Sequence, residues 1–152
     1  MSSQFEQIVS AVKTALSGIN GTSPYVTNFS DEGQVEIGGG ISQTGQQAQI
    51  AIGAPSLKTS RDELTSYTRT AMIPVVARCP ASENSQDERL LQAIRTASDI
   101  ATAIEANSAL WALCLEIDVE TDTYTGEEVG WSAGAVTAVV KVKWISTPGS
   151  GF

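Results

Sequence analysis

Hydrophobic side chains recur with a helical period in two stretches of the chain. The first predicts a helix over residues 3–17, opened by a capping box at Ser3 and Glu6 and ended by a left-handed Gly18. The second predicts a helix over residues 86–106, capped by Ser85. Its expected core-facing stripe consists of Leu90, Leu91, Ile94, Ala97, Ile100, Ala101 and Ile104.

Three other stretches alternate between apolar and polar positions, which is the pattern of half-buried strands. They cover residues 67–79, 113–122 and 136–145. Pro74 lies within the first of these and cannot donate a ladder hydrogen bond, so this strand is expected at a sheet edge or at a bulge.

Residues 20–66 are rich in Gly, Ser, Thr and Gln, with short β-like runs at 25–29, 35–38 and 48–53. They predict a polar hairpin projecting around residues 33–54, with Gly39 and Gln43 as candidate contact residues near its tip. The whole chain then forms one α+β domain over residues 1–152. Its order is α, β insertion, β-α-β-β, with a mostly antiparallel sheet and the helices packed on one face.

The 152-residue chain has 17 acidic and 9 basic side chains and no histidine. The missing histidine excludes Ser-His-Asp and Cys-His catalysis and His-ligated metal sites. The net charge of −8 argues against broad binding to nucleic acid or anionic membranes. The chain shows no basic-apolar leader and no apolar run long enough to span a bilayer, so we expect folding in a cytoplasm and no membrane contact.

Between Arg95 and Lys141 the sequence contains eight acidic residues and no basic one. Four of them occupy alternate positions and therefore project from one face of a strand: Glu116, Asp118, Glu120 and Asp122. Such a row could bind Mg²⁺ or Ca²⁺, or supply a carboxylate pair for acid–base chemistry. The simpler interpretation, which we favour, is a solvent face offset by Lys141 and Lys143 on the partner strand, with no cofactor.

Two cysteines in apolar runs, Cys79 and Cys114, indicate packing rather than a disulfide framework. Trp144 falls on the core-facing register of the last strand. Trp131 follows an acidic, glycine-bearing loop and is equally compatible with a core or an interface position.

Three segments together resemble the tail terminator proteins of long-tailed bacteriophages. They are residues 68–80, the capped helix from Ser85, and Gly130-Trp131-Ser132-Ala133 leading into residues 135–145. The resemblance implies a structural, non-enzymatic virion protein at the head–tail junction. It would form a ring, expected to be a hexamer, that caps the tail tube protein, stops its polymerisation and docks a neck or head-connector protein.

Several features of the residues are compatible with ring assembly. Pro74, the polar hairpin and Trp131 are candidate interface residues. The acids between residues 116 and 128 would line the lumen and repel DNA phosphates, so that DNA passes without specific binding. The alternatives are another neck ring protein of the head-closure or connector type, a small metal-dependent hydrolase using the 116–122 strand, and a peptide- or carbohydrate-binding module using the glycine-rich hairpin.

Overall fold

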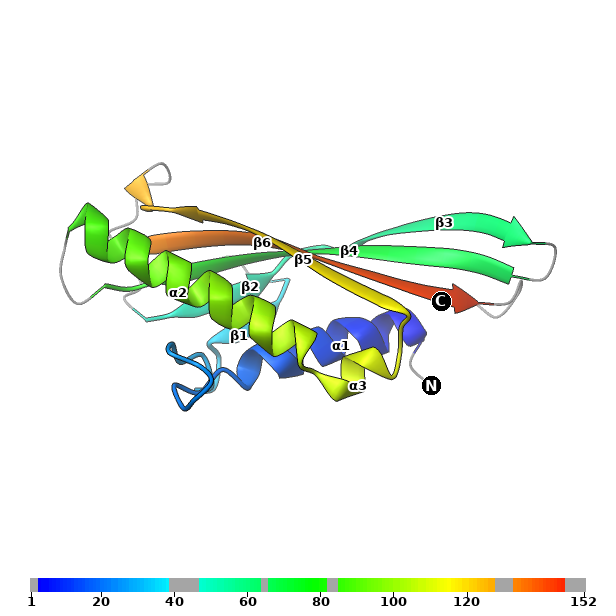
Figure 1. Cartoon of the computed structure of the whole chain (residues 1–152), viewed down its shortest axis with the longest axis horizontal. Helices are drawn as coiled ribbons and strands as arrows, with labels where there is room; N and C mark the ends of the chain where they lie inside the picture. The colour runs from blue at the N-terminus through cyan, green and yellow to red at the C-terminus, as the bar shows by residue number, and fades with distance from the viewer. Residues whose placement is uncertain (1–2, 39–46, 64–65, 82–84, 128–132, 147–152) are drawn as a thin grey trace.

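The computed structural model describes residues 3–38, 47–63, 66–81, 85–127 and 133–146. The elements are α1 (Gln4–Ser17), β1 (Val35–Ile37), β2 (Gln49–Ile52), β3 (Ser56–Glu63), β4 (Ser66–Cys79), α2 (Gln86–Glu105), α3 (Ser108–Trp111), β5 (Glu116–Tyr124) and β6 (Gly134–Ser146). The six described strands form one sheet in the order β1-β2-β4-β6-β5, with β3 also paired to β4. The expected α+β class with a mostly antiparallel sheet is confirmed (Figure 1).

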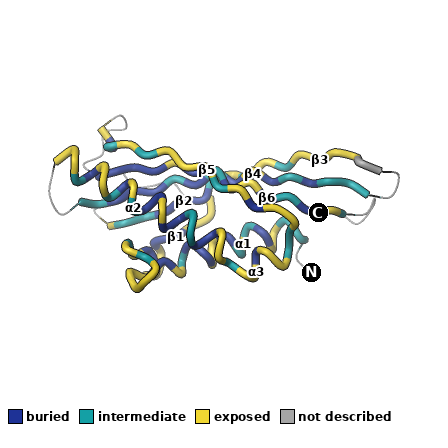
Figure 2. The backbone as a smooth tube through the Cα atoms, in the orientation of Figure 1, coloured by how far each residue is buried: buried dark blue, intermediate teal, exposed yellow. Residues whose placement is uncertain are grey.

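The described helices cover one face of the sheet, and the other face has no helix on it. Alternate residues of β4 and β6 are buried against α1 and α2, where they form one core. Phe5 of α1 packs on the buried Trp144 of β6 with ring centroids 6.1 Å apart. The residues between these core positions point to the helix-free face, called the open face below, and most of them are half-buried or exposed (Figure 2).

β4 lies inside the sheet and pairs with β6 in unbroken register, so its proline marks neither the expected edge strand nor the expected bulge. β6 pairs along its whole length on one side, and two shorter strands share its other side. β3 pairs with β4 as far as Met72, and β2 pairs from Val75 onward. Pro74 occupies the gap between these two neighbours, where its missing N–H costs no ladder bond, and its carbonyl accepts from Gly53 N at 2.8 Å.

The predicted hairpin around residues 33–54 is wrong, because β1 and β2 pair in parallel. Residues 25–29 form a loop with one isolated bridge, Asn20 to Asn28, instead of a strand. The sheet contains another hairpin, β3–β4, whose first strand the polar sequence did not reveal. It extends beyond the end of the helices together with the last residues of β6 (Figure 1).

Both long helices form where the sequence predicts them, but two details differ. Ser3 and Glu6 make the expected capping box, whereas Gly18 has right-handed φ and ψ of −81° and −5°. In α2, Leu90, Leu91 and Ile94 are 37–49% exposed, so this part of the predicted stripe is wrong. The helix packs instead through the smaller side chains of Ala93, Thr96, Ala97 and Ala103, followed by Ile100 and Ile104 near its end.

The small side chains bring α2 very close to the sheet. A Cβ built on Gly134 of β6 would collide with the carbonyl oxygen of Arg89, and it would also touch Ala93. A helix that approaches through its small residues leaves its large aliphatic side chains on the outer side. Close approach at Gly134 therefore explains why the N-terminal half of α2 exposes its leucines and isoleucine.

Candidate interaction surfaces

The acidic row lies on the open face, as the alternation predicted. Its four members project from β5, and each of them is exposed. Lys143 Nζ on β6 lies 3.1 Å from Glu116 Oε2, and Lys141 is opposite Asp118. One of the two lysines thus pairs with an acid of the row, and the other lies across from Asp118 in the sheet register.

The second half of the row has no basic residue opposite it on β6. Glu120 faces Val139, and Asp122 faces Thr137. The described residues contain no group of three or more His, Cys, Asp or Glu side chains that could hold a metal ion. These two carboxylates therefore have no lysine opposite them on β6, and their negative charge is exposed on the open face.

The acidic row follows the edge of the sheet, because β5 pairs with β6 alone among the described strands. The opposite side ends in two shorter strands, β3 beside the N-terminal half of β4 and β1 beside β2. An edge strand presents backbone N–H and C=O groups that another strand can pair with. β5 with nine residues and β3 with eight are the longer of these edges.

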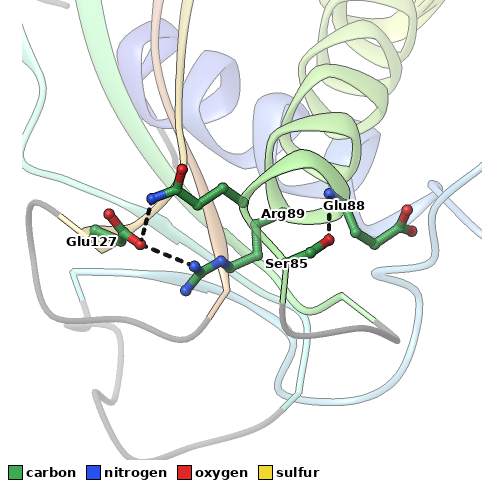
Figure 3. A network of polar contacts seen from close by, with 5 residues as sticks. Ser85, Glu88, Arg89 and Glu127 are labelled. Carbon is green, nitrogen blue, oxygen red and sulfur yellow. Dashed lines mark hydrogen bonds and ion pairs between the residues drawn. The ribbon is translucent and has the colours of Figure 1, made fainter.

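The start of α2 is tied to the connection between β5 and β6 by a polar network (Figure 3). Arg89 Nη2 lies 3.1 Å from Glu127 Oε1, which also accepts from Gln86 Nε2 at 2.8 Å. Ser85 Oγ accepts from the backbone N–H of Glu88 at 3.2 Å, which confirms the predicted N-cap of the helix. Beside this network lie the exposed Leu90, Leu91 and Ile94, the apolar surface of α2.

Asp99 of α2 holds the loop that follows α1, a contact that sequence reasoning missed. Its side chain is 3% exposed, and its Oδ2 accepts from Val26 N at 3.0 Å, Thr27 N at 2.7 Å and Thr27 Oγ1 at 2.6 Å. The available signal was an aspartate on the buried side of an amphipathic helix, next to Ile100. A charged side chain at such a position needs polar partners from another segment.

Burial keeps both thiols protonated, which disfavours the nucleophilic thiolate form. Burial raises the pKa of Cys79 to about 12, although the neighbouring Thr96 hydroxyl partly lowers it. Burial also raises the pKa of Cys114, whose Sγ donates to the Leu110 carbonyl at 3.3 Å. Both cysteines are free, in agreement with the packing role expected from the sequence.

A shallow cavity of about 390 Å³ lies between α1 and the strands beside it. It is lined by Phe5, Glu6, Val9, Ser10, Ile37 and Pro55. The lining combines apolar side chains with the Ser10 hydroxyl and the Glu6 carboxylate, which accepts from Ser3 N at 2.9 Å. This cavity therefore offers a mainly apolar contact surface.

Of the predicted interface residues, Pro74 lies on the open face, half-buried between β2 and β3. Trp131, Gly39 and Gln43 lie outside the described residues. Trp111 in α3 is 42% exposed and donates its indole N–H to the Glu105 carbonyl.

A search of protein-family models finds no match to the chain, and a search of curated proteins finds none either. Within the described part of the chain, no helix has both the length and the apolar character needed to cross a membrane.

Proposed function

We propose that this protein is a structural subunit of a bacteriophage tail, which forms a ring on the end of the tail tube. The ring ends polymerisation of the tube protein and joins the tail to a neck or head-connector protein. The sequence resemblance to tail terminators suggests this role, in which the protein works within the virion without enzymatic activity or a cofactor. Six copies are expected from the same resemblance.

The observation that best supports a DNA-conducting ring is the two-sided character of the sheet. Helices pack on one face, while the open face carries a row of exposed carboxylates along β5. The four carboxylates of β5 outnumber the three lysines on the same face, Lys58, Lys141 and Lys143. A lumen lined by this face would therefore repel DNA phosphates and let DNA pass without binding it. The helix-covered face would then form the outside of the ring.

Tube capping is the direct test of the proposed function. Purified protein is mixed with polymerising tail tube protein, and tube lengths and end densities are measured by negative-stain electron microscopy. We expect shorter tubes with a ring at one end. Rings that bind emptied heads but leave tube length unchanged would instead identify a head-closure or connector protein, and an absence of binding to both would contradict a neck or tail role.

The lumen assignment has a separate test, for which Asp118 is suitable because it lies in the middle of the row. Asp118→Lys should slow DNA ejection several-fold from particles that still contain the ring, because a cation in the wall attracts phosphate. Glu32→Lys makes the same charge change at an exposed residue outside the sheet and should leave the rate unchanged. Equal rates for the two variants would exclude a lumen lined by this row.

A further inference from the structure

We propose that copies of this chain join edge to edge, with the β5 edge of one copy paired antiparallel to the β3 edge of the next, and Lys58 opposite Glu120 of the neighbouring copy. This inference rests on the proposed ring and specifies the contact that closes it. The result is one continuous sheet that runs from copy to copy around the ring.

The strand directions permit this pairing. β3, β4, β6 and β5 alternate in direction across the sheet, since each described pair among them is antiparallel. A β5 strand placed beside the β3 of a neighbour therefore continues the alternation. Pairing of β5 with a second β5 would oppose two acidic rows and is disfavoured by like-charge repulsion. The contact is consequently head to tail, which is the type that generates rings.

Charge selects the register. Lys58 is exposed and shares the open face with the acidic row, because it lies in one cross-strand line with Thr70, Lys143 and Glu116. A shift by one residue would move Lys58 to the other face, so only registers two residues apart need comparison. Among the acids without a lysine opposite them on β6, Glu120 is the one nearest the middle of β5.

The geometry of closed sheets selects the same register. Within one copy, Glu120 of β5 lies level with Val139 of β6 and Pro74 of β4. On the β3 side, the position level with these residues is two residues before Ser56, because Ser56 is opposite Met72. Pairing Glu120 with Lys58 thus displaces successive copies by about four residues, or ~13 Å at ~3.3 Å per residue. Across four strands ~4.8 Å apart, this displacement corresponds to a strand tilt of about 35°.

Closed barrels have tilts of about 35–45°. A displacement of four residues across four strands is one residue per strand. Eight-stranded barrels with a shear of 8 have the same displacement per strand. Placing Lys58 opposite Asp118 or Asp122 instead would give tilts of about 19° or 46°, by the same spacings. The tilt thus excludes the Asp118 register, and the ratio of one residue per strand favours Glu120 over Asp122.

The sense of the displacement decides which face is inside. Viewed from the helix-covered face with β6 running upward, a right-handed β4–α2–β5 crossover places β5 at the left of the sheet and β3 at the right. In this view the contact displaces the right-hand copy upward relative to the left-hand copy. In a closed barrel seen from outside, strands with right-handed twist are tilted so that they rise to the right, which is the tilt that this displacement produces. The ring therefore closes with the helices outside and the acidic row inside.

Charge reversal tests the contact. Lys58→Glu and Glu120→Lys should each weaken assembly of the full-length chain roughly tenfold, and the double variant should restore it. Lys13→Glu, which reverses an exposed charge on α1, is the matched control and should assemble normally. Assembly of both single variants at the parental concentration would overturn the proposal.

Cross-linking tests the register independently. In a Cys114→Ser background, Lys58→Cys with Glu120→Cys should give a disulfide ladder ending at the closed ring, because opposite residues have Cβ atoms ~4.5–5.5 Å apart. Lys58→Cys with Asp118→Cys should cross-link at least several-fold less. The reverse preference would overturn this register. Capping of tubes by rings that lack the cross-link would leave the proposed function intact, whereas cross-linked rings that fail to cap would contradict the function alone.

Discussion

Replacing Asp99 should destabilise the fold more than most single changes at the periphery of the core. Asp99→Ala removes one carboxylate oxygen that accepts three hydrogen bonds from Val26 and Thr27. A hydrogen bond to a charged group contributes about 1.5–3 kcal/mol, and an unsatisfied buried donor costs about 1–3 kcal/mol. Water can reach part of this loop, because Val26 is 67% exposed. We therefore expect a loss of about 2–3 kcal/mol, which lowers Tm by roughly 5–10 °C for a chain of this length.

The measurement is urea unfolding followed by fluorescence of the buried Trp144, at one fixed chain concentration because assembly also stabilises the fold. Asp99→Asn retains a carbonyl acceptor and should lose about half as much stability. Ser98→Ala, at the exposed neighbouring position of the same helix, should change the unfolding free energy by less than about 0.5 kcal/mol. If Asp99→Ala also stays within that range, the three hydrogen bonds do not hold the loop in solution.

Three further substitutions or treatments test other parts of the structure. Gly134→Ala should lower the free energy of unfolding by about 1–3 kcal/mol, because the added Cβ would collide with the Arg89 carbonyl. Gly18→Ala should lower it less, and equal losses would argue against the close approach of α2. Cys79, whose pKa is raised to about 12, should react with iodoacetamide at pH 8 only after unfolding, and rapid labelling of the native chain would contradict its burial. Stability should also decline as pH rises from about 9 toward 12, because the thiol ionises in the unfolded chain before it ionises in the folded one. Glu116→Gln should change the unfolding free energy by less than about 1 kcal/mol, because both partners of the Lys143 ion pair are partly exposed; a larger loss would mean that the pair does more than neutralise charge.

The sequence was informative wherever one element's own periodicity decides its structure. Both long helices, the alternating strands and the exposed acidic row followed from local patterns of apolar and polar residues. The row's position opposite Lys141 and Lys143 also followed, because two neighbouring antiparallel strands face each other in a predictable order.

Features that depend on contacts between distant segments could not be predicted in the same way. The pairing of β1 with β2 is parallel, and no local signal distinguishes it from a hairpin. Pro74 indicated an edge strand or a bulge, but it lies inside the sheet, where two short strands leave a gap at that residue. The outward orientation of Leu90 and Ile94 depends on Gly134, a residue forty positions farther along the chain that admits the helix backbone.

The mass of the purified protein in solution tests the central claim most directly. One chain has a mass of 15.9 kDa, so a closed ring of six copies would have about 95 kDa. Mass photometry or sedimentation equilibrium should give this single discrete species, and Lys58→Glu should shift it toward the monomer. A monomer of the parental chain at every accessible concentration, or an open-ended series of oligomers without a closed limit, would contradict the ring.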